Sequence, residues 1–140
     1  TYRVSPNGSP QLIDTSNANI LMVSKSAVDK IGIFYEGYRH GNADYDYSMT
    51  ARSHGIPVYI TSRFCGACED DHTHGKELKD KIIKMSNKER ADYFSNPLHS
   101  SKDYLTFIRR QVPFKYPFTW ILRKLHERYP KFYYILNHGQ

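Results

Sequence analysis

Cysteine and long apolar runs are scarce in this sequence. Its 140 residues include two cysteines, Cys65 and Cys68, which are too few for a disulfide framework, so we expect a reducing, cytoplasmic environment. No apolar run is long enough to cross a bilayer, and residues 1–6 do not have the pattern of a signal peptide. These absences argue against a disulfide-rich secreted domain and against an integral membrane protein.

Acidic residues are also in the minority. Against 14 Asp and Glu residues there are 20 Lys and Arg residues, which gives a formal net charge of +6. This balance favours an anionic partner, and a nucleotide sugar, a phospholipid surface and a nucleic acid all satisfy it. With 39% hydrophobic residues the chain can bury one core, so we expect one domain or a piece of one.

The most informative stretch, residues 41–55, opens with two acids and closes with glycine. Asp44 and Asp46 fall in or just before the first turn of a predicted helix, where unpaired N–H groups and the helix dipole favour negative charge. Arg52 falls near the other end, where a cation is favoured, and Gly55 can adopt the left-handed conformation that ends a helix. An ionised carboxylate at such a helix start can accept a proton from a hydroxyl, hold a metal ion or simply cap the helix.

The residues around this helix follow a recognisable order. Asn19 precedes an apolar run and a short helix that ends at Gly32, and residues 43–46 then start the acidic helix that continues through Arg52. This order resembles the C-terminal half of family 2 glycosyltransferases, in which a Glu-Asp-x-Asp motif starts the corresponding helix. The resemblance covers residues 19–74 closely and the helical tail loosely.

The resemblance implies an α/β fold. It is the C-terminal part of the A-type nucleotide-diphospho-sugar transferase fold, with a short mixed sheet, flanking helices and a helical C-terminal tail. Residues 1–78 would form the acceptor side of the catalytic domain, and residues 79–140 a helical extension that packs on it. The family's nucleotide-binding region and its acidic DXD motif are not found in these residues. We therefore expect a fragment that transfers no sugar by itself and whose unpaired strand edges promote homo-oligomers.

The resemblance also implies an activity and the residues that carry it. Inverting enzymes of this family transfer a sugar from a nucleotide-sugar donor to a hydroxyl, here of a glycan or lipid-linked acceptor in bacterial surface polysaccharide synthesis. Asp44 stands at the position of the catalytic base, while Ala43 replaces the glutamate of the motif. The residues expected to contact substrate are Asn19, Tyr45, Asp46 and Arg52.

A divalent metal ion, Mn²⁺ or Mg²⁺, is the implied cofactor. The family places a metal-binding histidine in the loop after the next strands, and His72 and His74 both suit this place, with the sequence of residues 68–72 favouring His72. A solvated surface histidine is the plain alternative. A zinc site formed with Cys65 and Cys68 is another, although three residues separate the cysteine and histidine pairs where such sites usually have about a dozen.

The remaining secondary structure follows from local signals. Residues 5–10 read as a turn or loop, the apolar residues 20–23 predict a buried strand, and residues 56–61 predict a strand with one buried face. Ser24 is expected to cap a short helix over residues 25–31.

The last third of the chain is predicted to be helical. Capping signals at Ser86 and Ser100 start two helices, Pro113 and Pro117 interrupt the chain, and a further helix follows over residues 118–128. Together these signals predict a helical tail.

This tail is basic and rich in aromatic residues. Phe118, Ile121, Leu122 and Leu125 share one helical face, and most of the cations lie on the other. Such a helix could rest on an anionic membrane at the inner face of the cell, where a lipid-linked acceptor waits, or its apolar face could pack on the domain. A non-catalytic module that binds a membrane surface is therefore the rival function. Nucleic acid is not an expected partner, because no signature of a nucleic-acid-binding fold accompanies the charge.

Overall fold

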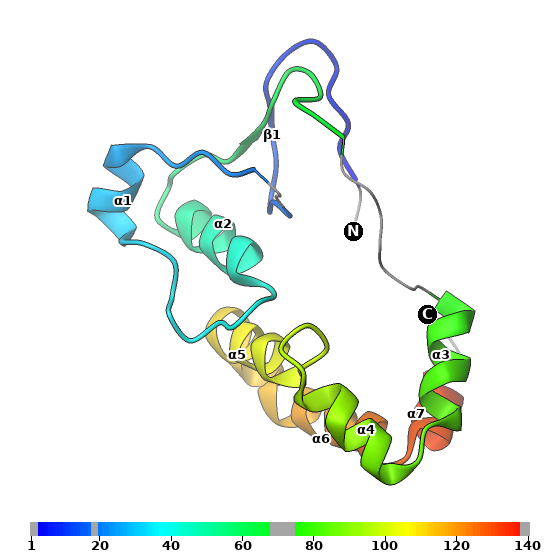
Figure 1. Ribbon diagram of the computed structural model, residues 1–140. Helices are drawn as coiled ribbons and strands as arrows, with labels where there is room; N and C mark the ends of the chain where they lie inside the picture. The colour runs from blue at the N-terminus through cyan, green and yellow to red at the C-terminus, as the bar shows by residue number, and fades with distance from the viewer. Residues whose placement is uncertain (1–2, 18–19, 68–74, 138–140) are drawn as a thin grey trace. The chain divides into compact units, whose positions relative to one another are not determined.

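The computed structural model describes residues 3–17, 20–67 and 75–137, and it consists of helices with one small antiparallel sheet (Figure 1). The chain forms two compact units. The first unit contains Thr1–Tyr38 and Asn42–Glu69, and the second contains Arg39–Gly41 and Asp70–Gln140. The broad α/β class is confirmed. The expected domain boundary, between residues 78 and 79, would fall inside a helix that belongs as a whole to the second unit.

The sheet of the first unit has two short strands. β1 (Gln11–Leu12) pairs in antiparallel register with β2 (Tyr59–Ile60), and a backbone hydrogen bond of 2.9 Å from the Ile13 N–H to the Val58 carbonyl continues the pairing. The predicted loop over residues 5–10 contains no helix or strand, and β1, which was not predicted, follows it directly. The predicted mixed sheet is replaced, in the described residues, by this antiparallel pair.

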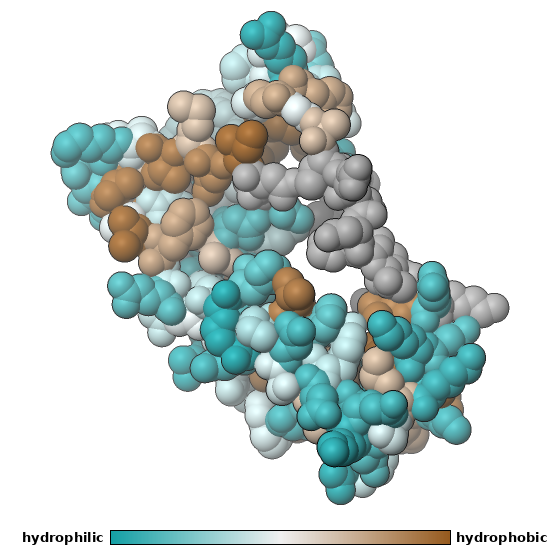
Figure 2. Space-filling view, viewed as in Figure 1, coloured by the Kyte–Doolittle hydropathy of each residue, from teal (hydrophilic) through white to brown (hydrophobic). Residues whose placement is uncertain are grey.

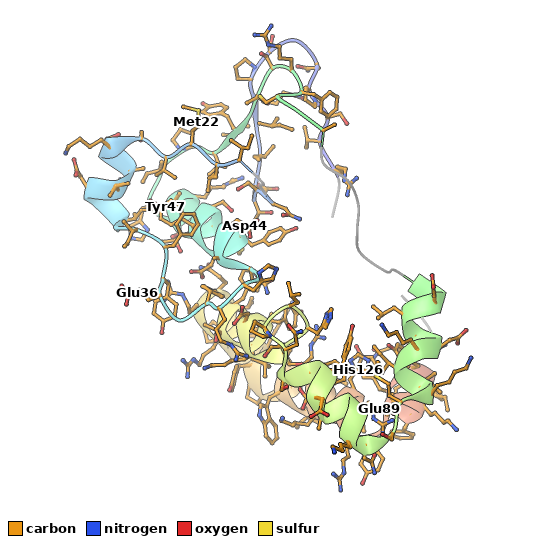
Figure 3. The ribbon with its side chains drawn as sticks, in the orientation of Figure 1. Met22, Glu36, Asp44, Tyr47, Glu89 and His126 are labelled. Atoms are coloured by element: carbon orange, nitrogen blue, oxygen red, sulfur yellow. The ribbon has the colours of Figure 1, made fainter. Side chains whose placement is uncertain are left out.

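Residues 20–23, predicted as a buried strand, do not form one. Met22 (Figure 3) is 93% exposed. Ile20 is exposed as well. An apolar run becomes a buried strand only when neighbouring strands pair with it on both edges, and β1 and β2 pair with each other instead.

The helix after this run matches its prediction. α1 (Lys25–Ile31) begins after Ser24, whose hydroxyl accepts the Ala27 N–H at 3.2 Å. It ends at Gly32, which has a φ of 78° in the left-handed region that glycine tolerates best.

α2 (Ala43–Ser53) is the acidic helix, and it packs against α1 in the first unit. Ala27 and Ala51 are both buried, which allows the two backbones to approach closely. The Tyr47 hydroxyl donates a 2.8 Å hydrogen bond to the carbonyl of Gly32, directly after α1. The core of the first unit is thus built around α2.

The second unit is a set of short helices. They are α3 (Gly75–Lys84), α4 (Asn87–Ser95), α5 (Ser101–Gln111), the 3₁₀ helix η1 (Pro113–Lys115), α6 (Tyr116–Arg128) and α7 (Pro130–Leu136). The capping box at Ser86 is confirmed, and Ser100 caps α5 through the Lys102 N–H. Pro113 interrupts the helices as predicted, because α5 ends at Gln111 and η1 begins at Pro113, whereas Pro117 lies inside α6. The two prolines occupy the first turns of η1 and α6, where a missing N–H is tolerated.

His126 lies at the centre of the helices of the second unit (Figure 3). It is 8% exposed, its Nε2 atom lies 2.9 Å from the Tyr134 hydroxyl, and its ring stacks on that of Tyr133 at 4.3 Å between centroids. Burial, together with the positive charge of Arg123, lowers the pKa of His126 from 6.5 to about 4. The folded state therefore contains a neutral imidazole at neutral pH.

This pKa predicts a loss of stability in mild acid. Because the folded pKa lies below the unfolded one, the unfolded chain binds the proton first, and the free energy of unfolding falls as the pH drops from about 6.5 toward 4. We expect a loss on the order of 2 kcal/mol over this range, measured by urea unfolding at several pH values. His126→Phe should flatten the dependence and the exposed-site control His54→Gln should keep it, whereas an unchanged dependence in His126→Phe would contradict this account.

In the part of the chain that the structure describes, no helix combines the length and the apolar character needed to cross a membrane.

Candidate active site on helix α2

The start of α2 has an unusual backbone. Asn42, the residue before the helix, has a φ of 67° and is the one described non-glycine residue with positive φ. Asparagine tolerates this left-handed conformation better than most residues, and its side chain makes no capping hydrogen bond here. The first-turn N–H groups of α2 are therefore not satisfied by Asn42.

Asp44 lies in this first turn, as predicted, and its side chain is half-buried (Figure 3). Its Oδ1 atom accepts the N–H of Tyr45 at 2.9 Å, and the side chain of Tyr45 is half-buried next to it. The carboxylate therefore accepts a helix-terminal N–H, and Asp44 as a residue is partly accessible to solvent. Both the capping role and the base role considered from the sequence are compatible with this position.

Asp46 has a different environment from Asp44. The two side chains point about 200° apart around the helix axis, and Asp46 is only 2% exposed. A buried carboxylate is better placed to support the helix than to meet a substrate that arrives from solvent. Asp46, which was predicted to contact substrate, is therefore less accessible to solvent than Asp44.

Two side chains of α2, those of Tyr47 and Ser48, fix the orientation of its first turns. The ring of Tyr47 stacks on Phe34 with 4.7 Å between centroids. The hydroxyl of Ser48 donates to the carbonyl of Asp44 at 2.8 Å and accepts the N–H of Ser16 at 3.1 Å. Both side chains are buried, so the backbone that carries Asp44 is held by the core of the first unit.

Arg52 does not join the first-turn residues. Its guanidinium donates to the carboxylate of Asp14 and to the carbonyl of Ile13. Eight residues separate it from Asp44, which corresponds to about 12 Å along a helix axis. The structure therefore gives Arg52 a role in linking α2 to the end of β1, and it brings Asp44 and Tyr45, but not Arg52, to one end of the helix.

The predicted metal ligands lie outside the described residues, as does the predicted substrate contact Asn19. His72 and His74 both fall in the undescribed segment 68–74. Within residues 3–17, 20–67 and 75–137, no group of three or more potential ligands could hold a metal ion. Of the proposed zinc ligands, the described one is Cys65, which is exposed and not in a disulfide bond.

The buried carboxylate of Asp103 has a structural role that the sequence did not predict. Asp103 of the second unit accepts the backbone N–H groups of Arg39, His40 and Gly41 at 3.1, 2.7 and 2.9 Å, all through its Oδ2 atom. The sequence placed Asp103 in a capping signal that starts with Ser100. A contact across more than sixty residues leaves no local signal, so sequence patterns could not have revealed it.

Comparison with known proteins identifies no relative of this chain. No protein-family model, no curated protein and no solved structure matches it. The geometry of α2 and the sequence resemblance are therefore the basis for a functional proposal.

Proposed function

We propose that this chain is the acceptor-side part of an inverting glycosyltransferase of the A-type α/β fold, with Asp44 as the catalytic base. The observation that carries the proposal is the position of Asp44. Asp44 is a partly accessible residue in the first turn of a helix that is held by buried side chains, while the second acid of that helix, Asp46, is buried and points away from it. A general base must be both accessible to its proton donor and rigidly held.

The proposed step needs little from the protein. Asp44 takes the proton of an acceptor hydroxyl while that oxygen forms a bond to the anomeric carbon of the donor sugar. The bond from this carbon to the nucleoside diphosphate breaks, and the diphosphate leaves with the bonding electrons. A divalent metal, Mn²⁺ or Mg²⁺, would stabilise the leaving group, and His72 and His74 are its proposed ligands.

The exposed apolar residues of the first unit support the idea that it completes a larger domain. Apolar side chains gather on the surface over α1 and the chain next to it (Figure 2). The exposed large apolar residues of this unit include Leu12, Ile20, Met22, Ile33, Tyr59 and Phe64. The nucleotide-binding half of an A-type domain would cover such a surface, and in its absence a second copy of the chain would do so.

The test is an assay of sugar transfer. A longer protein that joins these 140 residues to a nucleotide-binding half should release nucleoside diphosphate from at least one member of a panel of nucleotide sugars, in the presence of Mn²⁺ or Mg²⁺. The 140-residue chain alone should release none. Failure of the longer protein with every donor and acceptor in the panel would refute the proposed activity.

A second function, binding to an anionic membrane surface, is favoured by the outer face of η1 and α6. Phe114, Phe118 and Ile121 follow the i, i+4, i+7 spacing of one helical face, and Phe118 and Ile121 are 67% and 56% exposed. The sequence left open the alternative that the apolar face of this helix packs on the domain, and for Phe118 and Ile121, which are exposed, that alternative is wrong. Leu122 and Leu125 are half-buried. Exposed aromatic residues beside many cations are typical of interfacial helices.

This second function makes its own prediction. The double variant Phe118→Ser/Ile121→Ser should bind vesicles that contain phosphatidylglycerol at least about tenfold more weakly than the unmodified chain, because it loses apolar area that would enter the interface. Co-sedimentation with the vesicles measures the effect. The control Phe64→Ser/Leu98→Ser removes a similar exposed area elsewhere and should bind normally. Equal losses in both double variants would contradict a specific membrane face.

A further inference from the structure

A basic pocket lies among α4, α5 and α6 of the second unit. Its volume is about 840 Å³. Six cationic side chains line it, and the one acidic side chain among its lining residues is Glu127. The six cations are Arg39, Arg90, Lys102, Arg109, Lys124 and Arg128. Such an excess of positive charge in one concavity is costly unless an anion enters it.

Apart from Arg39, the cations of this basic pocket divide into two groups. Arg90 is buried and donates to the carbonyls of Met85 and Glu127 and to the side chain of Asn87, so its charge is held by the fold. Lys124 pairs with the carboxylate of Glu127 at 2.7 Å.

The second group has no such partners. Lys102, Arg109 and Arg128 are exposed, and none of their side chains forms an ion pair or a hydrogen bond with another described residue. These three charges therefore remain available to a ligand. Two of them are guanidinium groups, whose planar array of donors matches the oxygens of phosphate.

The first turn of α5 adds to the positive potential of the basic pocket. Ser100, Ser101 and Lys102 line it where the 11-residue helix begins, and the N-terminal end of a helix dipole favours anions. The guanidinium of Arg39 donates to the hydroxyl of Ser100 at 2.7 Å, which places a fourth cation at this end. Asp103 of the same turn is buried and is not among the lining residues.

The basic pocket is also lined by aromatic side chains. Phe94, Tyr116 and Trp120 line it, and Trp120 is the one tryptophan of the chain. Aromatic side chains among cations suit a ligand that joins an apolar or planar group to its negative charge. Trp120 also provides a fluorescent reporter inside the pocket.

We propose that the basic pocket binds a phosphate-bearing ligand through Lys102, Arg109 and Arg128. The ligand is either a soluble phosphate ester or the headgroup of an anionic phospholipid, because both present the same phosphate oxygens to these side chains. A concave site lined from three helices fits a compact phosphate group better than a long nucleic-acid backbone, which needs an extended basic surface.

This site is separate from the proposed functions on other parts of the chain. It requires neither Asp44 nor the apolar stripe of α6, since Trp120 and Lys124 lie on a different face of that helix from Phe118. Its success or failure in a binding experiment is therefore independent of any sugar transfer.

The test is a titration of the 140-residue chain with inorganic pyrophosphate, followed by Trp120 fluorescence. We expect a saturable change that the double variant Arg109→Gln/Arg128→Gln weakens by about 100-fold, about tenfold for each lost charge-assisted hydrogen bond. The control Lys88→Gln/Lys131→Gln removes the same charge from exposed positions that do not line the pocket. It should bind pyrophosphate within about twofold of the unmodified chain, the small change expected from long-range charge effects alone.

A second arm identifies the source of the phosphate. If the ligand is a lipid headgroup, vesicles with phosphatidylglycerol should change Trp120 fluorescence, pyrophosphate should compete, and Arg109→Gln/Arg128→Gln should bind poorly. If it is a soluble ester, pyrophosphate should not displace the chain from vesicles, and Arg109→Gln/Arg128→Gln should bind vesicles as well as the unmodified chain does. The proposal is overturned by the absence of saturable pyrophosphate binding, by equal losses in the two double variants, or by binding of a mixed oligonucleotide that pyrophosphate does not displace.

Discussion

Replacing Asp44 by asparagine should lower the kcat of sugar transfer by roughly two to four orders of magnitude, the usual contribution of a general base. Asparagine has nearly the same shape, and its side-chain oxygen can still accept the N–H of Tyr45, so the start of α2 should remain folded. What is lost is the capacity to take a proton from the acceptor. The KM for the donor should therefore change little, because donor binding does not depend on this proton.

The experiment compares Asp44→Asn with Asp29→Asn in the longer, active protein. Asp29 is an exposed acid of the first unit that pairs with Lys25 on α1, and exposed pairs of this kind contribute little to stability. Circular dichroism should show that both variants keep their helices. Full activity in Asp44→Asn would assign Asp44 to the helix alone and would remove the basis of the proposed mechanism.

Much of the helical structure could be predicted from the sequence because its signals are local. Ser24 and Gly32 bound α1 at the predicted residues, and Ser86 starts α4 with its capping box. A cap is a contact between residues three or four positions apart, so the sequence itself contains both partners. The position of Asp44 in the first turn of α2 is predictable for the same reason.

The pairing of strands was not predictable in this way. β1 and β2 are separated by more than forty residues, and each has only two residues, which is too short for a periodic pattern. The apolar residues 20–23 have a strong strand pattern and still lack a strand partner. Strand formation depends on a partner elsewhere in the chain, and a local pattern does not identify one.

The candidate sites show the same division. Asp44 and Tyr45 are neighbours in sequence and lie together. The resemblance grouped Arg52 with them, but the guanidinium of Arg52 forms an ion pair with Asp14. The basic pocket combines residues from three helices and from the segment 39–41, and no single stretch of sequence contains its pattern.

Asp103 accepts three backbone hydrogen bonds from residues 39–41, and this clamp should contribute strongly to the stability of the second unit. Asp103→Ala would remove an acceptor that is 2% exposed and would leave the N–H groups of Arg39, His40 and Gly41 without it. Hydrogen bonds to a charged group contribute about 1.5–3 kcal/mol each and are not additive, so we expect the free energy of unfolding to fall by about 4 kcal/mol. Urea unfolding followed by circular dichroism measures this loss. Asp92→Ala, at an exposed position on α4, should change the free energy of unfolding by less than about 0.5 kcal/mol.

The same clamp predicts a pH dependence with a definite sign. Burial raises the pKa of Asp103, but the backbone N–H groups of His40, Gly41 and Arg39 and the charge of Arg39 outweigh it, so the pKa lies below its ordinary value of 3.8. A depressed folded pKa stabilises the folded state above the unfolded pKa, and this stabilisation is lost as the pH falls through the folded value. The contribution of Asp103 should therefore be complete at pH 5 and should decline below about pH 4, a lower range than that of His126. Asp103→Asn, which cannot ionise, should be less stable at pH 5 and should lose less stability between pH 4 and pH 2 than the unmodified chain. Parallel acid-unfolding curves for the two proteins would show that the charge of Asp103 does not hold residues 39–41.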